Sequence, residues 1–389
     1  MIASAERPES GAPADPYLGQ DWRDAMERVQ RAALPEGRTV VSCRAPLGVG
    51  GLGRHLEEIK IALERSGQLE ACICGSTAAN ELTPARPSRR PRLPHPARLL
   101  RASPVPTSPG VRMRAFMSEF DEHAARRLPA ADHLLAFNCQ ALTQLRTARR
   151  EQYRSASLVS ANSHMRRVIH RHEQARRRYP LEGSWATHML GRNLAEYALA
   201  DHIYVASRYI RESFLEEGVA DEKLIDFPLT PHPRYRSAPA AERSDLFEIV
   251  YVGSLHVHKG VPLLIDAVRR LRGPDLRLRL IGGWGTRGMR RFIEAACAED
   301  PRIAAAPGDP LAHLTRASIC VHPAYEDGFA YAPAEALAAG VPALVSEDTG
   351  MKDLVDHGRN GLILPTGDLD ALTDALEAAY RGELGLQGR

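Results

Sequence analysis

Several features that mark other classes of protein are missing from this sequence. Its six cysteines are scattered and form no C-x-x-C pair, which argues against a zinc site or a disulfide framework and favours free thiols in a reducing compartment. No apolar run approaches the roughly 20 residues that a membrane-spanning helix needs. Residues 1–16 lack an apolar core, so we expect a disordered leader there and no signal peptide. These absences predict a cytoplasmic protein.

An excess of charge of one sign is missing as well. The chain carries 51 Lys and Arg against 48 Asp and Glu, a net charge of +3, which is too small to indicate a nucleic-acid partner by itself. The 44% hydrophobic and 25% charged residues are ordinary for a globular enzyme. A length of 389 residues allows two domains.

The first regular pattern is a strand, a helix and a second strand. Residues 38–43 read as a strand, residues 52–66 as an amphipathic helix and residues 69–74 as the next strand. This order is typical of a βαβ unit, so we expect an α/β fold with a parallel sheet. A second series begins with a strand at residues 247–253 and a helix at 261–271.

A glycine-rich loop follows the first strand. Gly48, Gly50 and Gly53 formally match the dinucleotide pattern G-x-G-x-x-G. In a dinucleotide fold the first glycine follows the strand directly and an acid ends the second strand. Here residues 44–47 intervene and no acid follows Cys74, so an NAD oxidoreductase is disfavoured. A tight structural turn is one alternative.

Residues 324–346 carry the strongest chemical signal, reading AYEDGFAYAPAEALAAGVPALVS. We predict a loop, then a helix that begins at Pro333 and ends at Gly340, then a short strand. The loop presents backbone N–H groups at a helix N-terminus, where they can bind a phosphate. Two carboxylates flank it, and that of Glu335 can accept the two hydroxyls of a ribose. The alternative is a buried helix with solvated acids.

This stretch resembles the nucleotide-sugar motif of glycosyltransferase family 4, Glu-Gly-Phe-Gly-x-Pro-x-x-Glu followed by Gly-x-Pro. The residues that match are Gly328, Phe329, Glu335, Gly340 and Pro342. The sequence departs from the motif at Asp327, which stands for the first Glu, at Ala330, which stands for the second Gly, and at the proline, which falls one residue late.

Other segments resemble the same family in the same order. Glu196-Tyr197 with Ala200-Asp201 matches one segment, and Lys259-Gly260 matches the pair whose lysine binds the donor diphosphate. Ser254 occupies a position that is often Arg, with His256 or His258 as its candidate substitute. The family's Pro-x-Gly-Val-Asp is missing, and PLTPHPRYR stands in its place.

The resemblance implies two Rossmann-like domains that face each other across a cleft, the GT-B architecture. We expect a leader at residues 1–35, an acceptor-binding domain at 36–232, a linker at 228–245 and a nucleotide-sugar-binding domain at 246–380. It further implies a retaining transfer from a UDP- or GDP-sugar to a glycan, lipid-linked or small-molecule acceptor. It implies no metal ion and no cofactor beyond the donor. The only Asp-x-Asp begins at Asp368, which we read as a helix N-cap.

The resemblance also assigns roles to residues. His164, Lys259 and Asp327 are the predicted catalytic residues, of which His164 follows a strand at residues 157–161 and matches the His of a Ser-Ser-His segment. The implied donor-binding residues are Gly50, Gly51, Ser254, Lys259, Gly282, Phe329, Ala330, Tyr331, Ala332 and Glu335. In this reading Gly50 and Gly51 let the backbone approach the donor diphosphate or the acceptor.

Two basic segments remain. Residues 84–101 hold six arginines and no acid, and residues 166–178 hold six arginines and one acid, Glu173. We interpret them either as solvated surface or as sites of attraction to anionic lipids or a phosphorylated acceptor, at the inner face of a membrane. The departures at Ser254, Asp327 and Ala330 leave a second hypothesis, a non-catalytic sugar-nucleotide-binding or scaffold protein of the same fold.

Overall fold

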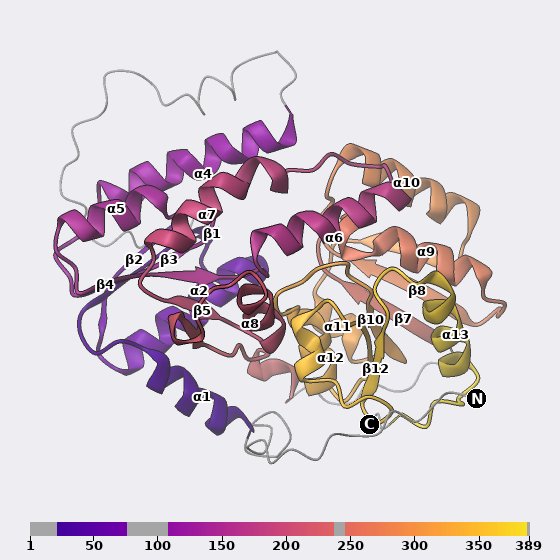
Figure 1. The fold of residues 1–389 in the computed structure, drawn as a ribbon. Helices are drawn as coiled ribbons and strands as arrows, with labels where there is room; N and C mark the ends of the chain where they lie inside the picture. Colours follow the sequence, from indigo (N-terminus) through magenta and orange to yellow (C-terminus); the bar gives the residue numbers. More distant parts are fainter. Residues whose placement is uncertain (1–21, 76–107, 237–245, 387–389) are drawn as a thin grey trace.

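The computed structural model describes residues 22–75, 108–236 and 246–386 (Figure 1). The disordered stretch predicted at residues 1–16 and the basic segment at 84–101 lie outside the described residues, whereas residues 22–33 of the leader predicted at 1–35 form a helix. The described part of the chain forms two six-stranded parallel sheets. The α/β class and the two Rossmann-like domains predicted from the sequence are therefore confirmed.

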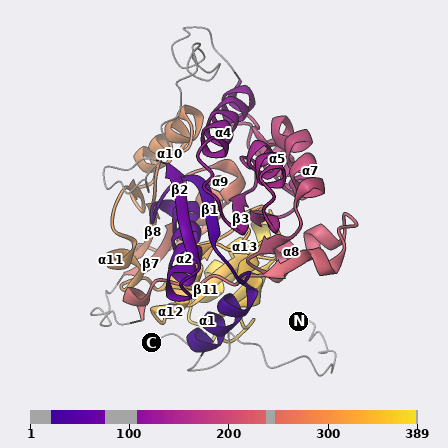
Figure 2. The same cartoon turned by 90° about the vertical axis from the view of Figure 1, so that its left-hand side faces the viewer.

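The N-terminal sheet has the strand order β2-β1-β3-β4-β5-β6. Its strands are β1 (Thr39–Pro46), β2 (Leu69–Gly75), β3 (His133–Phe137), β4 (Ser155–Ser160), β5 (Ile203–Val205) and β6 (Leu224–Asp226). The helices of this half are α1 (Trp22–Ala33), α2 (Gly50–Arg65), α4 (Pro109–Ala125), α5 (Leu142–Arg150), α6 (Met165–Arg178), α7 (Leu190–Leu199) and α8 (Arg208–Leu215). Helices α1 and α4 lie at opposite ends of the domain in both views (Figures 1 and 2).

The C-terminal sheet has the strand order β12-β11-β10-β7-β8-β9. Its strands are β7 (Phe247–Val252), β8 (Leu276–Ile281), β9 (Ile303–Ala306), β10 (Ile319–His322), β11 (Ala343–Ser346) and β12 (Gly361–Leu364). The helices are α9 (Val261–Arg270), α10 (Arg287–Glu299), α11 (Pro310–Leu314), α12 (Tyr331–Ala338) and α13 (Leu369–Tyr380), and a short 3-10 helix, η4 (Val257–Lys259), follows β7.

The central strands are buried on both faces, which explains their continuous apolar sequences. Every residue of β3, with the sequence HLLAF, is buried, and so is every residue of β10. A parallel strand covered by helices on both sides has no solvated face, so it shows no alternation of polar and apolar residues. Among the helices of the described residues none is long and apolar enough to cross a membrane.

Helix α6 joins the cores of the two domains (Figure 1). Met165 and Val168 near its start pack in the N-terminal core, whereas Ala175 and Tyr179 at its end pack in the C-terminal core. The Tyr179 hydroxyl donates a hydrogen bond to Asp266 Oδ2 at 2.7 Å. The range 36–232 predicted for the N-terminal domain therefore contains a segment that packs on the other domain.

Two local predictions need correction. Strand β1 extends to Pro46, so only Leu47 separates it from Gly48, and the expected spacer of residues 44–47 is wrong. Helix α12 begins at Tyr331 instead of Pro333. Proline is tolerated at its third position because the first-turn N–H groups of a helix have no partner within the helix.

Candidate active site

A cleft of about 960 Å3 lies between the two domains, at the carboxyl ends of their strands. Segments that follow β1, β7, β8 and β10 line it. Ligands of open α/β sheets bind at this edge, where the strand order reverses. The volume is at the upper end of the roughly 300–1,000 Å3 typical of ligand pockets. All ten predicted donor-binding residues and Asp327 line this cleft.

The N-terminal wall of the cleft is the start of α2. Gly48 and Gly50 have left-handed φ angles of +71° and +65°, which residues with a side chain rarely adopt. A Cβ atom on Gly50 would meet nothing within 4 Å, and one on Gly51 would lie 3.8 Å from the ring of Tyr331. The backbone at the N-terminus of α2 is thus open to the cleft, as an anion-binding loop requires.

The opposite wall is the start of α12. Ala330, the N-cap residue, has a left-handed φ of 63°, although it is not a glycine. It thus keeps the backbone conformation that glycine supplies in the motif, at a cost in strain. A Cβ on Gly328 would lie 2.1 Å from the carbonyl oxygen of Ala161, so the two domains approach here more closely than a side chain allows.

A cluster of charged groups lies at the base of this loop. Lys259 Nζ lies 2.8 Å from Asp327 Oδ2, and His322 Nε2 lies 3.0 Å from the same oxygen. Burial by itself raises the pKa of Asp327, but the Lys259 ammonium and the His322 hydrogen bond outweigh it and hold that pKa well below its usual range. Asp327 is therefore ionised at neutral pH and fixes the position of the lysine. The sequence did not point to His322.

Glu335 is 2% exposed and lies at the far end of the motif. Arg54 Nη2, from α2 in the other domain, lies 2.6 Å from Glu335 Oε1. The Arg54 guanidinium also stacks 4.0 Å above the ring of Tyr331, whose hydroxyl donates to Glu58 Oε1 at 2.7 Å. Burial raises the pKa of Glu335, and the guanidinium of Arg54 acts in the opposite direction.

Glu326 is a buried residue that the sequence analysis missed. Its Oε1 accepts hydrogen bonds from Ser163 N at 3.0 Å and Ser163 Oγ at 2.9 Å, and its Oε2 accepts one from Asn162 Nδ2 at 3.3 Å. It joins the loop after β4 of the N-terminal domain to the loop after β10 of the C-terminal domain. In the sequence, only its position next to Asp327 could have indicated a role for Glu326.

The structure does not bring His164 to the cleft. Its ring packs against Tyr197 and Phe214, with centroid distances of 4.9 and 5.2 Å, and its Nδ1 accepts a hydrogen bond from Arg166 N. Burial lowers the pKa of His164 to about 4. The imidazole serves as the N-cap of α6 and does not line the cleft in which we expect the sugar to bind. Asn162 lines the cleft in its place.

The suggested substitutes for an arginine at Ser254 are also turned away. Ser254 is exposed and lines the cleft, whereas His256 and His258 face Glu182, with His256 Nδ1 3.0 Å from Glu182 Oε2. Gly282 lines the cleft as predicted, and its backbone is so close to Gly253 that a Cβ would lie 1.8 Å from the carbonyl oxygen.

Part of the predicted linker also lines the cleft. His232, Arg234 and Tyr235, which stand where the family's Pro-x-Gly-Val-Asp is missing, all contribute to its wall. Tyr235 is 2% exposed, and the guanidinium of Arg234 lies 4.9 Å from its ring centroid. The departure from the family pattern therefore brings a cation to this wall.

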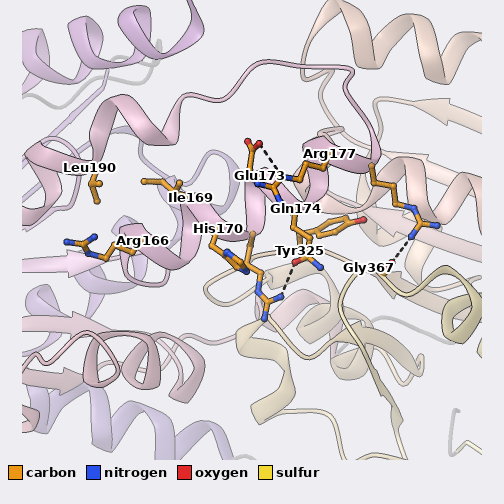
Figure 3. A pocket seen from close by; sticks show the side chains of 11 residues that line it. Arg166, Ile169, His170, Glu173, Gln174, Arg177, Leu190, Tyr325 and Gly367 are labelled. Carbon is orange, nitrogen blue, oxygen red and sulfur yellow. Dashed lines mark hydrogen bonds and ion pairs between the residues drawn. The ribbon is translucent and has the colours of Figure 1, made fainter.

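A second hollow, of about 990 Å3, runs along α6 outside the cleft (Figure 3). Its arginines already have internal partners: Arg171 lies 2.7 Å from Asp348, and Arg178 donates to the carbonyl of Gly367 at 3.0 Å. Arg177 lies 3.6 Å from Glu173. Arg171 and Arg177 thus have acidic partners, whereas the neutral carbonyl of Gly367 leaves the charge of Arg178 in place.

Comparison with known proteins agrees with this geometry. Residues 247–381 match the family model "Glycosyl transferases group 1". The chain is 27% identical over 145 residues to the capsular polysaccharide biosynthesis glycosyltransferase CapM of Staphylococcus aureus, a match that covers 36% of this chain and 38% of that protein. It is 33% identical over 154 residues to the D-inositol 3-phosphate glycosyltransferase of Kribbella flavida, covering 35% and 36%. The chain thus spans less than two fifths of these curated relatives.

Solved structures resemble most of the chain in fold. Sucrose-phosphate synthase from Thermosynechococcus elongatus matches with a TM-score of 0.63 and 20% identity, covering 89% of this chain and 90% of that one. The Anabaena protein HepE in complex with UDP and glucose matches with a TM-score of 0.59 and 15% identity, covering 88% and 90%. The chain therefore has the GT-B fold of glycosyltransferases. Residues 247–381 match the glycosyl transferases group 1 family model, and the predicted resemblance is confirmed to that extent.

Proposed function

We propose that this protein is a retaining glycosyltransferase that moves a sugar from a nucleoside-diphosphate sugar to an acceptor hydroxyl. The observation that carries the proposal is the Lys259–Asp327 pair at the base of the α12 loop, within a cleft of about 960 Å3 that both domains line. Structures of the same fold hold UDP with glucose, or ADP, which supports a nucleoside-diphosphate donor. UDP and GDP are the nucleoside diphosphates that we propose for the donor.

The proposed roles follow from the positions of the groups. The Lys259 ammonium and the N–H groups of Phe329, Tyr331 and Ala332 stabilise the leaving diphosphate through fixed charge and dipoles. Gly50 and Gly51 add the N-terminus of α2 from the other side. These groups stand in place before the reaction, so they cost little reorganisation when negative charge develops on the phosphate.

The remaining groups hold the sugar and the nucleoside. Asp327, oriented by Lys259 and His322, positions a sugar hydroxyl, and Glu335 holds the ribose. His164 is not a contact residue in this scheme; it orients the loop that carries Asn162. The two acids Asp327 and Glu335 have different tasks, so we do not propose a double displacement. The departing phosphate takes the acceptor proton on the same face of the sugar.

No metal ion and no further cofactor takes part in the proposed transfer. Asp368, the first acid of the only Asp-x-Asp, accepts hydrogen bonds from Asp370 N and Ala371 N at the start of α13, which confirms its assignment as an N-cap. The diphosphate charge is met by Lys259 and two helix N-termini instead. Magnesium added to dialysed protein is expected to leave the turnover unchanged.

The acceptor is a glycan, a lipid-linked sugar or a small molecule that enters from the N-terminal domain. We further propose a cytoplasmic protein that contacts anionic membranes through basic residues of that domain. Co-sedimentation with anionic and neutral liposomes at low and high salt tests the contact. Equal binding to both kinds of liposome contradicts the membrane contact and favours the interpretation of the α6 arginines as solvated surface.

Thermal-shift screening of UDP-, GDP- and ADP-sugars tests donor binding directly. A donor present at a hundred times its dissociation constant adds about 2.7 kcal/mol to the free energy of unfolding. The nucleotide sugar that stabilises the protein is then incubated with it. A transferase slowly releases nucleoside diphosphate, whereas a scaffold binds the donor and releases none. The proposal fails if no nucleoside-diphosphate sugar raises the melting temperature.

A further inference from the structure

Two histidines and a carboxylate converge outside the cleft. Glu182, in the turn after α6, faces His256 and His258 of the η4 segment, and the candidate ligand atoms of the three residues all lie within 4.8 Å of one another. His256 Nδ1 is 3.0 Å from Glu182 Oε2, and His258 Nδ1 is 3.8 Å from Glu182 Oε1. None of the three lines the donor cleft, so the proposed transfer leaves them without a chemical role.

These atoms suit a transition-metal ion. Imidazole nitrogen with carboxylate oxygen is a common donor set for Zn²⁺. Zinc bonds of about 2.0–2.2 Å place tetrahedral ligand atoms roughly 3.3–3.6 Å apart. The two imidazole Nδ1 atoms lie 3.0 and 3.8 Å from the two oxygens of the Glu182 carboxylate, one distance below that spacing and one above it. The three candidate ligand atoms lie within 4.8 Å of one another, so side-chain rotations that bring them to this spacing place all three around one ion.

The surroundings hold these side chains in place. Glu182 Oε1 accepts a hydrogen bond from Val257 N at 2.9 Å, and the ring of the buried His172 stacks on His258 with a centroid distance of 4.2 Å. A Cβ on Gly285 would lie 2.7 Å from His256 Nδ1, so the wall beside that nitrogen is bare backbone. The carboxylate and both rings are thus pre-positioned, which lowers the cost of ordering them around an ion.

We propose that Glu182, His256 and His258 form a zinc-binding site that ties the turn after α6 to the loop that carries Lys259. Zn²⁺ displaces the proton shared between His256 Nδ1 and Glu182 Oε2, which passes to solvent, and each imidazole keeps a proton on Nε2. Water completes the coordination. The ion stabilises the η4 turn, and it lies outside the chemistry of sugar transfer.

The test uses untagged full-length protein, treated with a chelator and then dialysed. Titration with ZnCl2 alone, followed by calorimetry and elemental analysis, is expected to show one equivalent bound with a sub-micromolar dissociation constant. Cobalt(II) in place of zinc is expected to give visible ligand-field bands. Zinc is also expected to raise the melting temperature.

Variants identify the ligands. Glu182→Gln, His256→Ala and His258→Ala are each expected to weaken zinc binding at least tenfold, while His313→Ala, a change at a histidine of α11, leaves it unaltered. Circular dichroism in the presence of chelator verifies that each variant is folded. Substoichiometric or only weak binding by the unaltered protein overturns the proposal, since the chain has fifteen histidines that can bind zinc loosely. Full binding by the His256→Ala and His258→Ala variants overturns it equally.

Discussion

Arg54 and Glu335 form an ion pair across the domain boundary, with Arg54 Nη2 2.6 Å from Glu335 Oε1. The two residues are 281 positions apart in the chain. Arg54 lies on α2 of the N-terminal domain and Glu335 lies on α12 of the C-terminal domain. Because Glu335 is almost fully buried, the charged form of its carboxylate is stabilised by the guanidinium of Arg54. The pair therefore links the residue proposed to hold the ribose to the opposite wall of the cleft.

The first prediction concerns Glu335. Its proposed contact with the ribose is far from the bond that breaks, so it is similar in the ground and transition states. Glu335→Gln is expected to raise the donor KM about tenfold with kcat comparatively unchanged. Steady-state kinetics with the donor as varied substrate measures both. A fall in kcat without a change in KM contradicts the assignment.

Asp327 is expected to behave in the opposite way. Its carboxylate is oriented by Lys259 and His322, and we propose that it contacts the sugar as charge develops at the anomeric carbon. Asp327→Asn is expected to lower kcat more than it raises KM. Asp327→Glu restores the family's acid but pushes the carboxylate into these two partners, so we expect it to lower activity as well. A gain of activity in Asp327→Glu identifies the native aspartate as a degraded site.

Lys259→Ala is expected to lower kcat/KM for the donor by roughly 2–4 kcal/mol of transition-state stabilisation, by analogy with the loss of an oxyanion donor. Lys352→Ala is the matched control. Lys352 pairs with Glu212 on the surface at 2.7 Å and does not line the cleft, so its removal is expected to change kcat/KM little. Equal kinetics of the two variants removes Lys259 from the donor site.

The left-handed backbone of Ala330 gives a stability prediction. A non-glycine residue in the left-handed conformation costs the folded state roughly 1–2 kcal/mol. Glycine avoids this cost, but its greater freedom in the unfolded chain lowers the free energy of unfolding by about 0.5–1 kcal/mol. Ala330→Gly is therefore expected to raise the free energy of unfolding by about 0.5–1 kcal/mol. Ala334→Gly, inside α12, is the control and is expected to lower it by about 1 kcal/mol or more. Denaturant unfolding measures both, and destabilisation by Ala330→Gly contradicts the strain.

Glu58 gives a pH-dependent prediction. Burial raises the pKa of Glu58 to about 7, although hydrogen bonds from Tyr331 and Thr230 act against it. A raised folded-state pKa means that the contribution of Glu58 to stability is full below about pH 4.5 and is lost as the pH rises through 7. The stability of Glu58→Gln relative to the native chain is expected to increase over that window, by at most about 1.4 kcal/mol per pH unit. A pH-independent difference refutes the raised pKa.

Short-range signals explain what the sequence predicted. Apolar periodicity and glycine loops identified strands such as β1 and helices such as α2, because these patterns depend on neighbours a few positions away. The motif residues Lys259, Asp327 and Glu335 were assigned by resemblance, and the structure brings them to one cleft. Helix ends were less certain, as the early start of α12 shows.

Long-range partners explain what the sequence did not predict. Glu326 binds Ser163, which is 163 positions away, and no local pattern indicates that contact. His164 follows a strand as a ligand-binding residue does, yet the rings of Tyr197 and Phe214 enclose it. A histidine at a strand end has the same local sequence whether it faces a cleft or a core. Only the packed structure separates these cases.

The path of α6 has a consequence for separating or recombining the domains. Ala175 and Tyr179 fill part of the C-terminal core, although they precede that domain in the chain by some seventy residues. A fragment beginning at residue 246 lacks this helix and exposes the apolar surface that it covers. In a chimeric protein that exchanges C-terminal halves at the linker, the end of α6 therefore comes from one parent and the core that it packs against comes from the other. Exchanges that also transfer residues 172–182 keep the end of α6 together with the core that it packs against.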